Sequence, residues 1–307
     1  MVPSTSSTRV NDARLLGWRA DRAAIDAALV TLCDRYADVT PSPVREPIRY
    51  SLLGGGKRLR GLLFLTAYRA AGGASDATTL AASIEIVHAY SLVHDDLPCM
   101  DDDDLRRGRP TVHRVYGVPI ATAAGVAMVP LAVRAALDGA QTIGLSLRVG
   151  ARIVADLMRA SGAGGMIGGQ LLDLESEGHR VGLAELERVH RGKTGALIET
   201  AVALGGVAAG AGENQIAALT DFGSAIGLAF QIADDVLDVT ATSDTLGKPA
   251  GRDLDLQKST YPALLGVVGA TERAAALVVD ACEALRGADL LSPDLEALAR
   301  LVVEREW

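Results

Sequence analysis

Two clusters of aspartates, far apart in the chain, constrain its fold more than any other sequence feature. The first contains Asp95, Asp96 and Asp101, and the second contains Asp234, Asp235 and Asp238. Both lie in apolar sequence, where a buried carboxylate is costly unless it is paired or bound to a cation. The fold must therefore hold these carboxylates where cations can reach them. Two facing clusters of this kind would bind several Mg²⁺ ions, an arrangement that suits a diphosphate or triphosphate.

The composition favours helices over strands. Of 307 residues, 49% are hydrophobic but only 4% are aromatic. Strands prefer β-branched and aromatic residues, whereas Ala and Leu, which are abundant here, favour helices. The apolar segments show helical periodicity, and no useful strand pattern, repeat or linker interrupts them. The sequence predicts one all-α domain over residues 1–307, with the aspartates at the ends of long helices.

Breaks between the expected helices are marked by Pro, Gly and short polar residues. Pro41, Pro43 and Pro47 should end a first helix over 12–38. Pro98 should end a long apolar helix that begins at Thr78. The other helices are expected at about 62–71, 119–140, 147–177, 183–208, 213–241, 258–270, 272–286 and 293–305.

Charge and cysteine content narrow the class of protein. The net charge of −8 argues against a nucleic-acid partner. Three scattered cysteines suggest neither zinc nor disulfides, and the N-terminal segment lacks the apolar core of a signal peptide. The uncharged stretch 115–133 is long enough to cross a bilayer, but its prolines and small residues favour a buried helix. We expect a cytoplasmic protein with no membrane span.

The second aspartate cluster has helical spacing. Asp234 and Asp238 are four residues apart, and Asp235 and Asp238 are three apart, so they face the same way on a helix. A bound cation would relieve the repulsion, and Mg²⁺ commonly takes one or two carboxylates together with phosphate oxygens. A solvated helix face or an N-cap is the alternative, but apolar neighbours such as Ile232 and Val236 disfavour it.

The first cluster needs a bend in the chain. Asp95 and Asp101 are six residues apart and cannot share one face of a straight helix. Pro98 should end the helix, so that Asp101 folds back beside Asp95. The arginines that follow, Arg106 and Arg107, would form either salt bridges or a mixed metal–guanidinium clamp on phosphate oxygens.

Basic residues gather in three patches. Only four of the 30 basic residues are lysines, and three of them, Lys57, Lys193 and Lys248, lie in these patches. Gly54, Gly55 and Gly56 precede Lys57, Arg58 and Arg60 in a turn that opens a helix and suits an anion, although it does not match a P-loop. Lys193 precedes Thr194, and Lys248 follows the second aspartate cluster. Two acidic clusters and three basic patches suit two diphosphates, one held through metal and one held by cations.

Together these motifs resemble the trans-isoprenyl diphosphate synthases of the polyprenyl synthetase family, which include farnesyl and geranylgeranyl diphosphate synthases. The resemblance covers residues 45–265. The motifs stand in the family order: Gly55-Gly56-Lys57-Arg58; Glu85 to Asp101 with Arg106-Arg107-Gly108; Gly168-Gly169-Gln170 with Asp173; Lys193-Thr194; Phe230-Gln231 with Asp234 to Asp238; and Gly247-Lys248 with Gly251-Arg252-Asp253.

The resemblance implies an isoprenoid synthase fold and activity. The fold would be a bundle of roughly ten or more helices around a central prenyl pocket, and the protein would be a homodimer. The activity would be a prenyltransferase that joins isopentenyl diphosphate to an allylic diphosphate such as dimethylallyl or geranyl diphosphate. Metal-assisted ionisation, condensation and proton loss would follow in that order.

The resemblance also assigns roles to individual residues. Mg²⁺, about three ions per site, would be held by Asp95, Asp96, Asp101, Asp234, Asp235 and Asp238. The allylic diphosphate would contact Arg106, Lys193 and Lys248. The diphosphate of isopentenyl diphosphate would contact Gly56, Lys57, Arg58, His88 and Arg107. Thr194 and Gln231 would lie next to the carbocation that forms.

Product length should depend on the floor of the pocket below Asp95. One helical turn rises about 5.4 Å, so the floor should be formed by Tyr90 and Ser91. An aromatic residue at Tyr90, together with the inserted Pro98-Cys99, resembles bacterial farnesyl diphosphate synthases and favours a farnesyl product.

Two departures from the family pattern bear on this site. Gly125-Val126 replaces the more common Gly-Asp, as in some geranylgeranyl diphosphate synthases, so that product stays an alternative. Arg252 stands where lysine is common; the charge is kept but the geometry is not.

Three other classes of protein fit less well. A class I terpene cyclase would share the fold and one aspartate motif, but it would carry an Asn/Ser/Glu motif in place of the second cluster. A non-catalytic synthase subunit would have damaged aspartate motifs, whereas these are intact. A purely structural helical protein leaves carboxylates in apolar helices unexplained.

Overall fold

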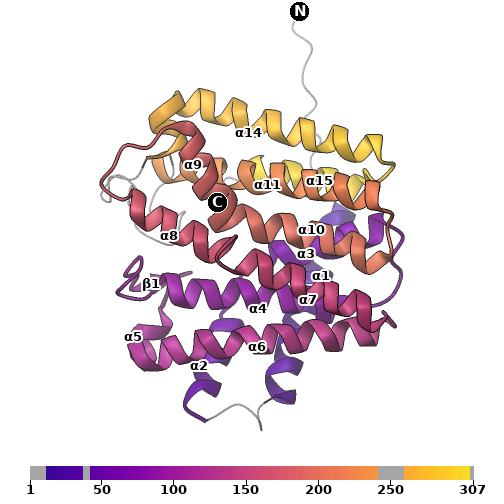
Figure 1. Ribbon diagram of the computed structural model, residues 1–307, viewed down its shortest axis with the longest axis horizontal. Coiled ribbons are helices and arrows are strands. Elements are labelled where there is room, and N and C mark those ends of the chain that lie inside the picture. The colour runs from indigo at the N-terminus through magenta and orange to yellow at the C-terminus, as the bar shows by residue number, and fades with distance from the viewer. Residues whose placement is uncertain (1–11, 37–41, 241–258, 305–307) are drawn as a thin grey trace, which may run out of the picture.

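Long helices lie side by side in stacked layers in the computed structural model, which describes residues 12–36, 42–240 and 259–304 (Figure 1). The first half of the chain forms α1 (Asp12–Arg35), α2 (Ser42–Leu52), α3 (Leu59–Ala70), α4 (Thr78–Asp95), α5 (Val112–Tyr116) and α6 (Val118–Thr142). The second half forms α7 (Leu147–Ser161), α8 (Met166–Ser176), α9 (Leu183–His190), the π-helix η1 (Arg191–Gly195), α10 (Ala196–Ala209), α11 (Glu213–Thr240), α14 (Tyr261–Gly287) and α15 (Pro293–Glu304). The predicted all-α class is confirmed.

Helix α4 runs through the middle of the bundle. It is buried along most of its length, and it packs against α1, α3 and α6. A helix that is apolar all round is stable only when other helices surround it. Helix α11 packs against α10 and α14 in the same way. The two aspartate clusters therefore stand at the carboxyl-terminal ends of α4 and α11, as the sequence predicted.

A short hairpin follows the first aspartate cluster. Strands β1 (Leu105–Arg106) and β2 (Arg109–Pro110) pair antiparallel, with Arg106 opposite Arg109. The sequence did not predict these strands, because two residues are too few to show an alternating pattern. The turn between them places Arg107 in a left-handed conformation (φ 55°) next to Gly108.

Several predicted helix boundaries are wrong. The segment 147–177 is two helices, α7 and α8, because the chain turns at residues 162–165. The predicted break between 258–270 and 272–286 is present, but it lies at Gly266 (φ 72°), where α14 consists of two helical stretches joined by a kink. Pro47 lies inside α2 rather than ending a helix. It is the sixth of the eleven residues of α2, and its missing N–H removes one backbone hydrogen bond of that helix.

Three helices, α6, α11 and α14, are long and apolar enough to cross a membrane by length and composition alone. In the bundle, α6 packs against α4 and α7, and α11 carries the second aspartate cluster. Charged groups within a span are costly, which argues against a membrane role for α11. The absence of a span at 115–133, which is largely α6, stays a prediction.

Candidate active site

The first aspartate cluster folds back on itself as predicted. The backbone N–H of Asp101 donates to the carbonyl oxygen of Asp95 at 2.8 Å. Burial raises the pKa of the Asp95 carboxyl to about 6, although the nearby Lys193 ammonium acts to lower it. A carboxylate in this setting gains free energy from any further cation that reaches it.

Asp96 faces a different partner from its neighbour Asp95. Its buried carboxylate accepts hydrogen bonds from Nε (2.9 Å) and Nη2 (2.5 Å) of Arg106. Asp103 accepts a third from Nη2 of the same guanidinium at 2.8 Å. The structure shows a salt bridge, which orients Arg106 beside the cluster, and the metal–guanidinium clamp on phosphate oxygens stays a prediction.

The second cluster divides its carboxylates between two environments. Asp235 is tied into the protein: Oδ2 lies 3.2 Å from Nε2 of His190 and accepts from the backbone N–H of Tyr261 at 3.0 Å. Asp238 is also buried, yet neither of its oxygens has a hydrogen-bond partner among the described residues. A buried carboxylate without a donor is costly, so Asp238 is suited to a cation.

A π-helical turn positions the predicted Lys193 and Thr194. Nζ of Lys193 lies 2.7 Å from Oδ2 of Asp173 on α8 and 3.6 Å from Oδ2 of Asp101. Burial acts to lower the pKa of the Lys193 ammonium, but the carboxylates of Asp173 and Asp101 outweigh it and raise that pKa. The ammonium is therefore fully charged at neutral pH. It links α8 to the loop after α4.

Thr194 and Gln231 lie in contact, as their predicted shared role requires. The Thr194 hydroxyl donates to Oε1 of Gln231 at 2.8 Å. Nε2 of Gln231 in turn lies 3.4 Å from Oδ1 of Asp235. This chain joins η1 to α11 and fixes the amide so that its oxygen faces Thr194.

A close approach of two backbones permits this π-helical turn. A Cβ atom added at Gly169 of α8 would lie 2.0 Å from the backbone nitrogen of Lys193. Only glycine fits there, so Gly169 allows α8 and η1 to meet. Gln170, the next residue, donates from Nε2 to Oδ1 of Asp101 at 3.2 Å.

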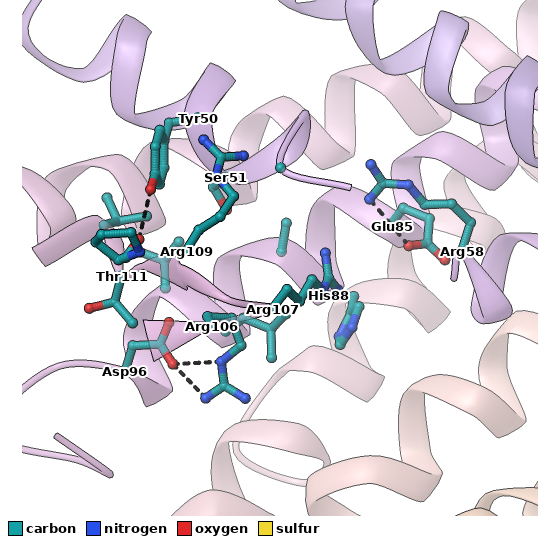
Figure 2. A pocket seen from close by; sticks show the side chains of 16 residues that line it. Tyr50, Ser51, Arg58, Glu85, His88, Asp96, Arg106, Arg107, Arg109 and Thr111 are labelled. Atoms are coloured by element: carbon teal, nitrogen blue, oxygen red, sulfur yellow. Dashed lines mark hydrogen bonds and ion pairs between the residues drawn. The ribbon is translucent and has the colours of Figure 1, made fainter. Parts of the chain in front are cut away.

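A small cavity of about 50 Å³ lies beside the first cluster (Figure 2). Its lining includes His88, Asp96, Arg106, Arg107 and Arg109. Burial, together with the neighbouring arginine charges, lowers the pKa of the His88 imidazole well below its usual value. His88 is therefore neutral beside a group of fixed positive charges, and such a group attracts an anion.

The Gly-rich turn closes one side of this cavity. The Arg107 guanidinium donates to the carbonyl oxygen of Gly55. At Gly56 (φ 142°) an added Cβ would lie 2.7 Å from Nη1 of Arg107. The conformation favours glycine at this position, and a larger residue would also displace the Arg107 guanidinium. The exposed Lys57 follows at the end of the turn.

Arg58, which is predicted to hold a diphosphate, also has partners within the protein. Its buried guanidinium donates to Asp26 (2.8 Å) and to the carbonyl oxygen of Leu52 (2.7 Å). Its third nitrogen lies 3.8 Å from the buried Glu85 carboxylate (Figure 2). Nε and Nη2 are hydrogen-bonded within the protein and Nη1 is in an ion pair, which favours a structural role for Arg58, although its side chain also lines the cavity.

Arg60 stands two residues after Arg58 in the same basic turn, but it is not among the residues that line the cavity. It is buried, and its Nε has no hydrogen-bond partner among the described residues. Burial lowers the pKa of its guanidinium, while the charges of Glu85 and Asp234 act to raise it. Arg60 thus lies within electrostatic reach of both the Arg58–Glu85 pair and the second aspartate cluster.

These two arginines should respond differently to substitution. Arg58→Met leaves the buried Glu85 without its cation and should cost about 3 kcal/mol of unfolding free energy. Arg60→Gln should instead raise KM for an anionic substrate about tenfold. Denaturant unfolding and steady-state kinetics measure the two effects. Equal KM values in both variants would contradict this division of roles.

The predicted floor residues lie one turn below Asp95. The buried Tyr90 donates its hydroxyl to the carbonyl oxygen of Ser161 at 3.1 Å. The Ser91 hydroxyl donates to the carbonyl oxygen of His88, within its own helix. Val126, the departure noted on α6, is 59% exposed and so does not line the interior.

The donor set fits Mg²⁺. Asp95, Asp101, Asp234 and Asp238 supply carboxylate oxygens, and Asp238 is buried without a hydrogen-bond donor. In the part of the chain that the structure describes, no three acidic, His or Cys side chains converge on one point. Mg²⁺ usually takes one or two carboxylates and completes its shell with water and substrate phosphate, so these carboxylates would hold it together with a bound diphosphate.

The last predicted motif lies outside the described residues. Lys248 belongs to it, together with Gly247, Gly251, Arg252 and Asp253. The role of Lys248 toward the allylic diphosphate therefore stays a prediction.

An all-helical bundle with carboxylates at two helix ends and a cationic cavity beside them defines a site for diphosphate chemistry. Comparison with known proteins names the class: residues 41–286 match the polyprenyl synthetase family, and the chain belongs to it. The chain is 46% identical over 269 residues to farnesyl diphosphate synthase of Escherichia coli (strain K12), covering 86% of this chain and 90% of the relative. It is 43% identical over 269 residues to the chloroplastic geranylgeranyl pyrophosphate synthase of Capsicum annuum, and the match covers 87% of this chain and 72% of that relative.

Solved structures agree with the fold. Geranylgeranyl pyrophosphate synthetase from Pyrococcus horikoshii superimposes with a TM-score of 0.84 at 32% identity, over 96% of this chain and 99% of the other. The protein is therefore a short-chain prenyltransferase of isoprenoid biosynthesis, a farnesyl or geranylgeranyl diphosphate synthase. Its family implies isopentenyl and allylic diphosphates as substrates and typically uses Mg²⁺.

Proposed function

We propose that the protein is a farnesyl diphosphate synthase that adds isopentenyl diphosphate to dimethylallyl diphosphate and then to geranyl diphosphate. The observation that carries the choice of product is Tyr90. This bulky ring is buried one turn below Asp95 and is hydrogen-bonded to α7. A ring at that depth stops chain growth early.

The two diphosphates would occupy different parts of the site. The allylic diphosphate would bind between the two aspartate clusters, with Arg106 and Lys193 in contact with it and Lys248 in the same role. The diphosphate of isopentenyl diphosphate would bind at the cationic cavity through Lys57, His88 and Arg107. Arg58 also lines this cavity, but we give it a mainly structural role, because its guanidinium already contacts Asp26, Leu52 and Glu85. We add the buried charge of Arg60, whose Nε has no hydrogen-bond partner among the described residues.

Bound Mg²⁺, about three ions, would neutralise the departing diphosphate and so favour cleavage of the allylic C–O bond. The carboxylates of Asp95, Asp101, Asp234 and Asp238 are suited to hold these ions. Asp96 and Asp235 would orient Arg106 and Gln231, since their carboxylates contact those side chains. Fixed charge of this kind acts most strongly when it needs no rearrangement during the reaction.

The remaining steps need orientation more than acid–base chemistry. The Thr194 hydroxyl and the Gln231 carbonyl would lie next to the allylic cation, where their dipoles favour positive charge. The double bond of isopentenyl diphosphate attacks the cation and forms the new C–C bond. Loss of a proton, with the released diphosphate as acceptor, restores a double bond and completes the cycle.

Product analysis tests the proposal. The protein is incubated with Mg²⁺, isopentenyl diphosphate and dimethylallyl diphosphate, and the dephosphorylated alcohols are separated by chain length. Farnesol is the expected product. Geranylgeraniol as the main product would contradict the farnesyl assignment. Hydrocarbon formed from added farnesyl diphosphate, without prenyl alcohol, would instead identify a terpene cyclase.

Tyr90→Ala should lengthen the product. Removal of the ring opens space below Asp95, and one further isoprene unit then fits. We expect geranylgeraniol to become the main alcohol, whereas Ser91→Ala should change the distribution little because the Ser91 hydroxyl bonds to its own helix. An unchanged farnesol fraction in Tyr90→Ala would show that the floor lies elsewhere.

We further propose a cytoplasmic homodimer that forms through α6. This helix exposes Val118 (41%), Val126 (59%) and Leu137 (41%). Exposed apolar side chains on one long helix favour burial against a partner surface. Light scattering should give twice the chain mass of 31.8 kDa. A mass of one chain at assay concentration would contradict the dimer.

A further inference from the structure

The ring of Tyr90 is held at two places. Its hydroxyl donates to the carbonyl oxygen of Ser161, the last residue of α7, at 3.1 Å. The ring also meets His94 one turn along α4, with centroids 5.8 Å apart and planes at 78°. This edge-to-face geometry is the favoured one for aromatic pairs. Tyr90 is therefore fixed at its tip by α7 and at its body by His94.

His94 is itself fixed on α6. Its Nε2 lies 3.2 Å from the carbonyl oxygen of Thr122. Because a carbonyl oxygen only accepts, Nε2 carries the proton in this contact. The ring fits over Gly125, where an added Cβ would lie 2.1 Å from Nε2 and 2.4 Å from Cδ2. Only glycine leaves room for the imidazole at this point of α6.

We propose that His94, seated on Gly125, is a positioning residue that determines product length by holding Tyr90 in place. The three residues Tyr90, His94 and Gly125 are called the Tyr90 brace below. This inference rests on the proposed function, because it supposes that Tyr90 limits the product. It adds that the limit on product length depends on the support that His94 gives to the Tyr90 ring.

The physical reason is that a growing prenyl chain presses on the ring. A ring without support can rotate about its side-chain bonds into any adjacent space, and side-chain rotamers interconvert far faster than turnover. The hydroxyl contact fixes only the tip. The imidazole fills the space toward α6, so the ring cannot turn that way while His94 is seated.

His94→Ala should raise the ratio of geranylgeranyl to farnesyl product about fivefold, a change within the range of one aromatic contact. The ratio is the informative quantity, because His94 adjoins Asp95 and its loss also lowers the rate. A ratio equal to that of the wild type would overturn the brace. His94→Phe keeps a ring beside Tyr90 and should restore most of the farnesyl fraction.

Gly125→Ala tests the same brace from the opposite helix. Its methyl group would displace the imidazole, so the ratio should rise in the same direction without any change to α4. Gly150→Ala on the neighbouring α7 is the matched control, because its Cβ would make only ordinary contacts, with Ala140 Cβ at 3.5 Å and Leu137 Cδ2 at 3.9 Å. A rise in Gly150→Ala equal to that in Gly125→Ala would overturn the assignment to His94.

A double-variant cycle separates positioning from direct lining. If His94 acts through Tyr90, then His94→Ala should add nothing to the product ratio of Tyr90→Ala. Additive effects would show that His94 limits the chain on its own. Different results would refute the Tyr90 brace and the proposed function. Geranylgeraniol from the wild type refutes the farnesyl assignment, whereas farnesol from both wild type and His94→Ala refutes only the brace.

Discussion

Asp95→Asn should lower kcat about a thousandfold, the size of effect expected when one preorganised electrostatic group is removed. The substitution keeps the shape of the side chain and removes its charge. Burial raises the pKa of the Asp95 carboxyl to about 6, so it is a weaker acid than an exposed aspartate. The same burial strengthens the attraction of its carboxylate for a bound cation. Asp234→Asn should have a similar effect from the opposite cluster. Steady-state kinetics with saturating substrates measure both.

Asp102→Asn is the matched control for this experiment. It makes the same chemical change in the same acidic loop, but Asp102 is exposed and adopts a left-handed conformation (φ 49°) that asparagine tolerates. Its kcat should stay near that of the wild type. Near-normal turnover in Asp95→Asn, or an equal loss in Asp102→Asn, would refute a specific role for the carboxylates at the helix end.

Gly169→Ala should lower both stability and activity. The new methyl group would lie 2.0 Å from the backbone nitrogen of Lys193, so α8 and η1 must separate. Overpacking of this kind costs about 3 kcal/mol. The separation also moves the Lys193 ammonium away from Asp173, and a misplacement of about 1 Å can cost about 100-fold in kcat. Denaturant unfolding and steady-state kinetics measure the two losses separately.

Gly164→Ala is the corresponding control. Gly164 lies in the turn between α7 and α8, and an added Cβ there meets nothing within 4 Å. This variant should unfold and turn over like the wild type. If Gly169→Ala behaved like Gly164→Ala, the close approach of α8 and η1 would not be what positions Lys193.

The positions of the aspartate clusters were predictable because they follow from local rules. Pro98 ends α4 near Asp95, and a short turn then brings Asp101 back beside Asp95. The breaks around 162–165 and at η1 were not predictable. They depend on backbone contacts between helices, such as Gly169 against Lys193, and a glycine alone does not show which backbone it will meet.

The roles of Arg58 and Arg60 show a similar limit. Both stand in one basic turn, and their sequence context is almost the same. The left-handed conformation of Arg58 (φ 54°) places it before α3, where its guanidinium reaches Asp26 and Glu85. A non-glycine residue in that conformation is uncommon, so the sequence did not predict these contacts, and the family resemblance assigned the diphosphate to Arg58 rather than Arg60. The packing of the His94 ring against Gly125 is likewise a contact between two helices, and no rule of sequence spacing predicts it.

Incorporation of labelled isopentenyl diphosphate into prenyl product tests the central claim most directly. The protein is mixed with the label, Mg²⁺ and dimethylallyl diphosphate, and each component is omitted in turn. We predict that label enters the prenyl product only when both diphosphates and Mg²⁺ are present, and that Asp95→Asn abolishes this signal. Consumption of the allylic diphosphate without incorporation of label would contradict the account, because the second diphosphate site would then have no function.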